Sequence, residues 1–374
     1  MAESVGERLV EFAPSEEWAK ALRVAPRHVF VPDQVWDGVA FAWRDRGQDA
    51  RAWWASVHSD HALITQVDDG EVALGPASAA RVVNWTSSCS APGVVFRFLE
   101  LLEPYPGDRV VEVGTGTGWT AGLLSARLGA DRVSSVEVDE RVAAQAARNL
   151  ARAGLGPRLV VDDGAKGDPA GAPFDRVHVT CGVADFPYAW VEQTRPGGII
   201  VAPWMPNPKE FGYKVRLTVT QDAAVGRFYG GAGYTMLRSQ RTGYPPITGE
   251  ERHRRAHVDP RRISRAGAGL WVALAGLMPG VSAGGSDLDD GTHRYAVQHV
   301  SSGSHAIAVR PSDGGSAEVR QRGPRDLWHE LEAAYLTWVG WSEPPIECFG
   351  LTVDAAGQHV WLYSPNNPIS KVVR

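Results

Sequence analysis

Three glycines at alternate positions follow a short apolar run and precede a helical segment. They are Gly114, Gly116 and Gly118. A strand that turns through glycines into a helix N-terminus lets the backbone approach a ligand closely and directs free N–H groups at it. In the Gly-x-Gly-x-x-Gly pattern of dinucleotide sites, Trp119 would have to be the third glycine. The spacing therefore favours S-adenosylmethionine (SAM) over NAD, and disfavours an NAD-dependent oxidoreductase.

Acidic residues end the next two strand-like runs. Glu137 closes the run 133–137, 19 positions after Gly118, and Asp163 with Gly164 follows the run 158–161. This is where a βαβ unit brings a carboxylate to ribose hydroxyls, and the second acid suits an adenine amino group. We expect the following residues to contact the cofactor, which would leave as S-adenosylhomocysteine: Glu112, Gly114, Thr115, Gly116, Gly118, Glu137, Asp163, Gly164 and Thr180.

Strands and helices alternate through this region. After the helical segment 121–128, a second one at 141–153 separates two strand-like runs, and further strands are expected at 174–180 and 195–203. Such alternation predicts a doubly wound, Rossmann-like α/β fold with a mostly parallel sheet and a ligand at the carboxyl ends of its strands.

The 374 residues exceed one average domain. Two prolines in 204–208 predict a linker, so we expect a SAM-binding catalytic domain over 1–205 and an α+β accessory domain over 206–374. In the second part a strand at 214–220 is expected. The remaining predictions are helices at 263–278 and 327–339, a Gly/Ser/Asp loop at 280–291, strands at 295–300 and 305–309, and a hairpin of 349–354 with 359–363.

Composition limits the functional classes. A net charge of −5 disfavours a general nucleic-acid binder. No apolar run is long enough for a bilayer, and the N-terminus lacks a signal-peptide pattern. Cys89, Cys181 and Cys348 are too few for a disulfide framework, and no Cys or His pair has zinc-ligand spacing. We therefore expect a cytoplasmic protein that acts on no membrane and holds no metal, with Cys181 a packing residue.

With these motifs in register, the first 205 residues resemble the protein-L-isoaspartate O-methyltransferase family. The segment 25–32 is similar to the family's entry signature, Ser88-Cys89-Ser90-Ala91-Pro92 stands where it has Thr-Ile-Ser-x-Pro, and 172–180 is close to its fourth-strand pattern. The resemblance implies a SAM-dependent carboxyl O-methyltransferase. In that reading Ser88 and Ser90 orient the acceptor carboxylate, since hydroxyls donate to a carboxylate without forming an ion pair. The alternative is that the serine before Ala-Pro caps the next helix.

Three departures separate the chain from the repair enzymes of that family. The active-site segment is serine-rich, about twenty extra residues lie near 67–84, and the region 206–374 is long. These features resemble the branch associated with ribosomally synthesised modified peptides. That resemblance implies esterification of an aspartate in a constrained, macrocyclic peptide (lanthipeptide, lasso peptide or graspetide), followed by closure to an aspartimide.

Other functions stay open at this point. Isoaspartate repair is the first alternative, and a peptide-binding module with a vestigial SAM fold is the second. The basic run 252–255 with Arg261, Arg262 and Arg265 is either a solvated surface or a docking site for an acidic peptide.

Overall fold

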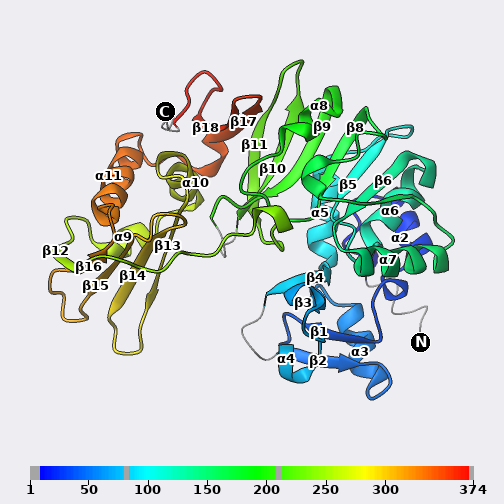
Figure 1. The fold of residues 1–374 in the computed structure, drawn as a ribbon, viewed down its shortest axis with the longest axis horizontal. Coiled ribbons are helices and arrows are strands. Elements are labelled where there is room, and N and C mark those ends of the chain that lie inside the picture. Colours follow the sequence, from blue (N-terminus) through cyan, green and yellow to red (C-terminus); the bar gives the residue numbers. More distant parts are fainter. Residues whose placement is uncertain (1–8, 80–83, 208–211, 370–374) are drawn as a thin grey trace.

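The computed structural model describes residues 9–79, 84–207 and 212–369. A nine-stranded sheet forms the centre of the molecule, with the order β18-β17-β11-β10-β9-β8-β5-β6-β7 (Figure 1). In chain order, the first five strands of this sheet are β5 (Val110–Val113), β6 (Val133–Glu137), β7 (Arg158–Val161), β8 (Phe174–Val179) and β9 (Thr194–Trp204). These five run parallel, which confirms the predicted Rossmann-like α/β class.

Helices cover both faces of the parallel part. Val110 and Val133 pack with the helices of one face, whereas Val111 and Val113 pack with α8 on the other. This alternation along β5 is what a strand buried on both faces requires. The helices here are α2 (Glu16–Val24), α5 (Pro92–Leu102), α6 (Trp119–Leu128), α7 (Glu140–Arg152) and α8 (Tyr188–Glu192), with the short 3-10 turns η1 (Arg27–Val29), η3 (Ala130–Arg132) and η4 (Gly164–Lys166).

The central sheet continues beyond residue 205. Antiparallel strands extend it from β9: β10 (Gly212–Val219), β11 (Ala223–Ala232), β17 (Phe349–Asp354) and β18 (Gly357–Leu362). The predicted boundary at 205 thus falls between two hydrogen-bonded neighbours, β9 and β10. Separate folding of 1–205 and 206–374 stays a prediction. Of the expected linker 204–208, Trp204 belongs to β9, and residue 208 lies outside the described residues.

A four-stranded antiparallel sheet precedes the glycine loop and was not anticipated from the sequence. Its order is β2-β1-β3-β4, and Figure 1 shows it below the central sheet. It consists of β1 (Gln34–Asp37), β2 (Ala42–Asp45), β3 (Leu63–Val67) and β4 (Trp85–Cys89), with α3 (Ala50–Val57), α4 (Pro76–Ala79) and η2 (Asp68–Gly70). Because β4 leads directly into α5, this sheet delivers the serine-rich segment to the central sheet.

A five-stranded antiparallel sheet lies at the opposite end of the molecule (Figure 1). It contains β12 (Arg252–Arg255), β13 (Val281–Asp287), β14 (His293–His299), β15 (His305–Arg310) and β16 (Glu318–Arg322). Two helices pack on this sheet, α9 (Pro260–Ser264) and α11 (Leu327–Gly340). A third helix, α10 (Ala268–Leu277), contacts α11 and β18. The remaining elements after residue 205 are the 3-10 turns η5 (Arg238–Gln240) and η6 (Ile346–Cys348).

Two predictions in this region are wrong. The helix expected over 263–278 is broken at Arg265–Gly267 into α9 and α10, because Gly267 adopts extended backbone as the N-cap of α10. The loop expected over 280–291 contains strand β13. No helix in the described part of the chain is long and apolar enough to span a membrane.

Candidate cofactor and acceptor site

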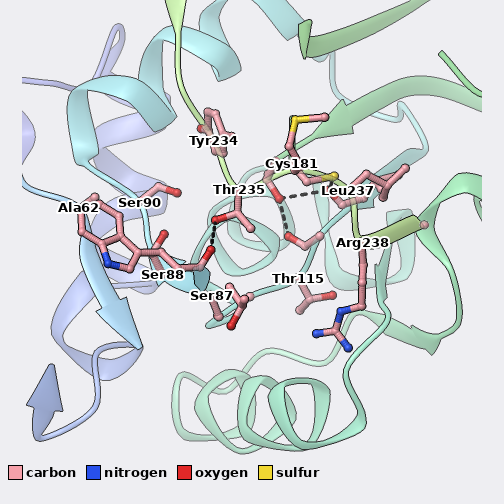
Figure 2. Close-up of a pocket in the computed structure, with 18 of the residues that line it drawn as sticks. Ala62, Ser87, Ser88, Ser90, Thr115, Cys181, Tyr234, Thr235, Leu237 and Arg238 are labelled. Atoms are coloured by element: carbon pink, nitrogen blue, oxygen red, sulfur yellow. Dashed lines mark hydrogen bonds between the residues drawn. The ribbon is translucent and has the colours of Figure 1, made fainter. Parts of the chain in front are cut away.

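A cavity of about 780 Å³ opens at the carboxyl ends of the parallel strands, beside the four-stranded sheet (Figure 2). Nine of the eleven residues predicted for the site line this cavity. They are Ser88, Ser90, Gly114, Thr115, Gly116, Glu137, Asp163, Gly164 and Thr180. The strands that carry them lie side by side, so residues far apart in the chain come together at one edge of the sheet.

The glycine loop is held by the end of β8. The Thr180 hydroxyl donates to the carbonyl oxygens of Val113 and Gly114, at 3.1 and 2.5 Å. A Cβ on Gly114 would lie 2.6 Å from that hydroxyl, and the φ of Gly114 is 97°. Only glycine satisfies both constraints. The loop is therefore shaped so that its backbone lines the cavity.

Glu137 is the acid at the end of β6. Its two carboxylate oxygens accept the backbone N–H groups of Gly116 and Asp139, at 2.9 and 3.1 Å. Burial raises the pKa of Glu137, and these two donors oppose the shift because they stabilise the ionised form. A carboxylate fixed in this way at the cavity wall fits the hydroxyls of a ribose.

The acidic turn after β7 is equally constrained. The Asp163 carboxylate accepts from the backbone N–H of Ala165 at 2.9 Å and from the Ser239 hydroxyl at 3.2 Å. A Cβ on Gly164 would lie 2.6 Å from Val113, and the Gly164 carbonyl accepts the Trp190 indole N–H. This turn presents a carboxylate and a side-chain-free surface, which fits the polar edge and the face of an adenine.

Glu112 and Gly118 do not line the cavity. Glu112 is fully buried and accepts the Ser135 hydroxyl at 2.5 Å, and burial raises its pKa to about 8. Gly118 begins α6 with a φ of 85° and packs against α7. Their roles as cofactor contacts stay predictions. In the structure Glu112 is linked to Thr115 of the loop through the Ser135 hydroxyl, and Gly118 is the N-cap of α6.

The serine-rich segment meets the glycine loop directly. The carbonyl oxygen of Ser88 is 3.4 Å from where a Cβ on Gly116 would lie, and both Ser90 and Tyr234 line the cavity. The N-cap of α5 is Ala91, with no side-chain cap. The alternative that Ser90 caps this helix is therefore wrong. Figure 2 shows Ser88 and Ser90 facing Tyr234 and Thr235 across the cavity.

Sequence reasoning missed the segment 233–242, which lines the opposite wall. Met236 forms a parallel β-bridge with Gly182, and the Thr235 hydroxyl donates to the carbonyl of Trp85 at 3.1 Å. Ser87 of β4 was missed too. The resemblance to the family's Thr-Ile-Ser-x-Pro segment could have indicated it, because Ser88 and Ser90 lie close to it. Nothing local in 233–242 indicates that Met236 pairs with Gly182, which lies some fifty positions earlier in the chain.

Cys181 follows Thr180 at the cavity wall. Burial raises the pKa of its thiol, so the thiolate needed for nucleophilic attack is disfavoured. Among the described residues no cluster of three or more His, Cys, Asp or Glu side chains is arranged to hold a metal ion.

A doubly wound sheet whose glycine loop, strand-end glutamate and acidic turn meet in one cavity defines the class of SAM-dependent methyltransferases. The family model described as protein-L-isoaspartate(D-aspartate) O-methyltransferase matches residues 76–225. A relative of that name from Methanopyrus kandleri is 34% identical over 206 residues, covering 53% of this chain and 75% of the relative. The chain belongs to this family, and it is a SAM-dependent carboxyl O-methyltransferase.

Two further comparisons define how far the likeness extends. The relative of the same name from Pyrococcus horikoshii is 41% identical over 115 residues, which is 30% of this chain and 52% of the relative. A solved structure titled protein-L-isoaspartate O-methyltransferase matches with a TM-score of 0.57 at 20% identity, covering 97% of this chain and 100% of that chain. The shared fold thus extends through the C-terminal region, so the length of 206–374 does not separate this chain from structures with that name.

Proposed function

We propose that this enzyme methylates an aspartate side chain in a constrained, ribosomally made peptide, and that the ester then closes to an aspartimide. The proposal is supported chiefly by one observation: the serine-bearing end of β4 meets the glycine loop inside one cavity. Ser88 and Ser90 place hydroxyl donors where an acceptor carboxylate would lie beside the cofactor.

The residues need to position the carboxylate rather than activate it. An aspartate with an ordinary pKa near 3.9 is ionised at neutral pH and is already nucleophilic. Arg238 and Arg241, the two arginines of the wall, are paired with Asp69 and Asp139, so neither would form a simple ion pair with the acceptor. Orientation of this kind is worth on the order of 7–11 kcal/mol in well-aligned reactions.

SAM supplies a methyl group on a sulfonium sulfur. A carboxylate oxygen of the peptide forms the new C–O bond as the C–S bond breaks, and the electron pair stays on sulfur. The backbone amide nitrogen of the following residue then attacks the ester carbonyl, the amide proton is lost and methanol leaves. This ring closure is intramolecular and needs no further residue of the enzyme.

Isoaspartate repair is the second candidate. It is favoured by the names of the relatives and by the match of the whole chain to a solved structure of that name. In both candidates the cofactor site is the same, and they differ only in the acceptor.

Mass spectrometry of three acceptors separates the two candidates. The enzyme and SAM would be incubated with a macrocyclic aspartate-containing peptide from a neighbouring pathway, its linear form and an isoaspartyl peptide. Gain of one CH2 followed by loss of methanol on the macrocycle alone is the expected result. Methylation of the isoaspartyl peptide at an equal or higher rate would establish the repair function instead.

A further inference from the structure

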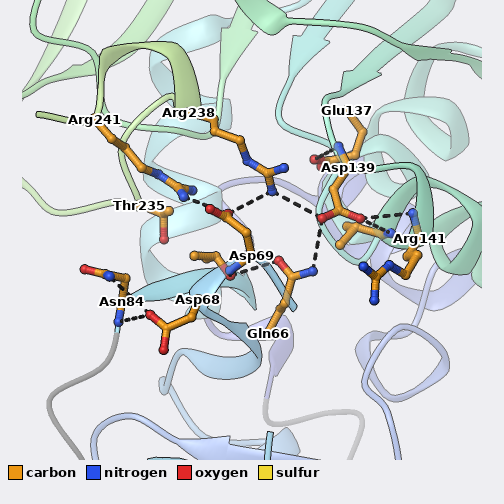
Figure 3. Close-up of polar contacts among 12 residues, drawn as sticks. Gln66, Asp68, Asp69, Asn84, Glu137, Asp139, Arg141, Thr235, Arg238 and Arg241 are labelled. Carbon is orange, nitrogen blue, oxygen red and sulfur yellow. Dashed lines mark hydrogen bonds and ion pairs between the residues drawn. The ribbon is translucent and has the colours of Figure 1, made fainter. Parts of the chain in front are cut away.

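Arg238, which lines the cavity, connects two segments beside it (Figure 3). Its Nη2 lies 2.9 Å from the Asp69 carboxylate and 3.2 Å from the Asp139 carboxylate. Asp69 belongs to η2, within the extra residues near 67–84, and Asp139 is the N-cap of α7. One guanidinium from the 233–242 wall thus joins the four-stranded sheet to the turn that carries Glu137.

Further contacts reinforce this junction. Arg241 pairs with the same Asp69 carboxylate at 2.7 Å. The Gln66 amide donates to Asp139 at 3.2 Å and accepts the Thr86 hydroxyl at 2.8 Å. These side-chain contacts therefore join the β3–β4 pair to the segment 238–241 and to the start of α7. We call Asp69, Asp139, Arg238 and Arg241 the clasp.

The clasp lies beside the proposed ribose carboxylate. Arg238 and Arg241 line the same cavity as Glu137, and the backbone N–H of Asp139, the residue that Arg238 pairs with, donates to the Glu137 carboxylate at 3.1 Å. The Asp139 side chain is only 8% exposed, so its pair with Arg238 is less screened by solvent than a surface pair. The Nε of Arg238 is also buried, with no hydrogen-bond partner in the described part of the chain.

We propose that Arg238 is a positioning residue for the cofactor. It acts through Asp139: it holds the Asp139 carboxylate at the start of α7, and the Asp139 backbone N–H in turn donates to the ribose-binding carboxylate of Glu137. The clasp also joins η2 to the segment 233–242, so it restrains that wall of the cavity, and breaking it should make cofactor exchange faster. This inference concerns the cofactor end of the cavity and does not depend on which carboxylate is methylated.

Binding and release of SAM test the proposal without any turnover. Affinity is measured by calorimetry, and release by stopped-flow fluorescence, for which Trp85 and Trp119 in the cavity wall are natural reporters. Arg238→Gln should weaken SAM binding by about tenfold, a loss of one charge-assisted interaction, and should accelerate release. Arg238→Lys should recover part of the affinity. Added salt should accelerate release in the wild type more than in Arg238→Gln.

Asp69→Asn tests the clasp without changing a residue next to Glu137. Asp69 contacts Arg238 and Arg241 but belongs to η2. Asp69→Asn should accelerate SAM release with a smaller loss of SAM affinity than Arg238→Gln. The double variant with both substitutions should accelerate release by less than the two single variants combined, because both break the same contact. Arg23→Gln, which removes an exposed pair with Glu16, is the matched control.

The proposal is overturned by wild-type affinity and release in folded Arg238→Gln, or by additive effects in the double variant. If Arg238→Gln does not fold, Asp69→Asn decides alone, and unchanged release would then overturn the clasp. Glu137→Ala tests whether the ribose site is assigned correctly. If this variant bound SAM with unchanged affinity, the ribose of the cofactor would have to bind elsewhere.

Discussion

The structure excludes one of the two interpretations of Ser90. Ala91 occupies the N-cap position of α5 with no side-chain cap, and Ser90 lines the cavity, so the serine is available to an acceptor rather than to the helix. We expect Ser90→Ala to slow methyl transfer about tenfold at saturating peptide while SAM affinity stays nearly intact, because its partner is the acceptor. Ser125→Ala, which removes a buried hydroxyl within α6, is the control. Unaltered kcat in Ser90→Ala would contradict the orienting role.

Glu112 carries a second prediction at this scale. Its carboxyl is fully buried and its pKa is raised to about 8, chiefly by burial, so the neutral form predominates at neutral pH. A carboxyl whose folded pKa lies above its unfolded value gives full stability below the unfolded pKa, near 4.5, and loses that stability as pH rises through the folded pKa.

Glu112→Gln keeps the shape and removes the titration. The wild type should therefore lose stability relative to Glu112→Gln between pH 4.5 and 8, by on the order of a few kcal/mol. Urea unfolding of both proteins across this range measures the difference, in which the effects of other titrating groups cancel. A constant difference over the range would show that Glu112 is not protonated in the folded state.

At the scale of elements, the sequence predicted those helices and strands that are determined by interactions within a few residues of the chain. The strand ending at Glu137 appears with the expected bounds, and the strand–loop–helix unit around Gly114 appears with its helix beginning at Trp119, two residues earlier than expected. Both could be predicted because apolar periodicity and glycine spacing act within a few residues. The segment 233–242 could not be predicted, because its place depends on pairing between Met236 and Gly182. Such long-range pairing leaves no periodic signal in the segment itself.

Strand β13 shows why composition misled the prediction. Gly284, Gly285 and Ser286 are typical of loops, yet they pair in register with β14. A Cβ on Gly285 would lie 2.6 Å from the Tyr295 ring, so the glycine is required by packing across the strands rather than by a turn. Packing of this kind becomes visible only when the partner strand is known.

Arg27 ties several elements to the serine-rich segment. Its buried guanidinium donates to five carbonyl oxygens, those of Val57, Ser59, His61, Cys89 and Ser90. Lysine has three donors on one nitrogen and cannot reproduce this fork. We expect Arg27→Lys to lower the free energy of unfolding by about 2–5 kcal/mol and to reduce kcat more than SAM affinity. Denaturant unfolding measures the first effect. Arg23→Lys, at an exposed position, should change neither.

At the scale of the whole molecule, the basic run of β12 is largely used internally. Arg254 pairs with Asp326 and with the buried Glu332, and Arg261 pairs with Asp259. These arginines therefore stabilise the five-stranded sheet and its contact with α11. Replacing them would perturb folding, so they are poor probes of peptide docking.

Other arginines are better placed to bind an acidic peptide. Arg255, Arg294 and Arg320 are exposed on the five-stranded sheet, and in the described part of the chain none forms an ion pair within 4.0 Å. Register places Arg320 opposite Ile307 and Arg294 opposite Val309, on the face away from buried Val319 and Ala308. An acidic peptide bound there would be held by charge, and its affinity would fall with salt.

If the five-stranded sheet recruits the peptide, a triple variant should bind an acidic macrocycle more weakly. The variant combines Arg255→Ala, Arg294→Ala and Arg320→Ala, and its KM for the macrocycle should rise several-fold. Its kcat should stay nearly unchanged, because these residues lie outside the cavity. The salt dependence of KM should flatten. A matched triple variant uses Arg51→Ala, Arg132→Ala and Arg148→Ala, three exposed arginines outside this sheet. Steady-state kinetics at several salt concentrations compare the two. Equal KM values in both triple variants would mean that the sheet plays no part in peptide recognition, even if the catalytic assignment is correct.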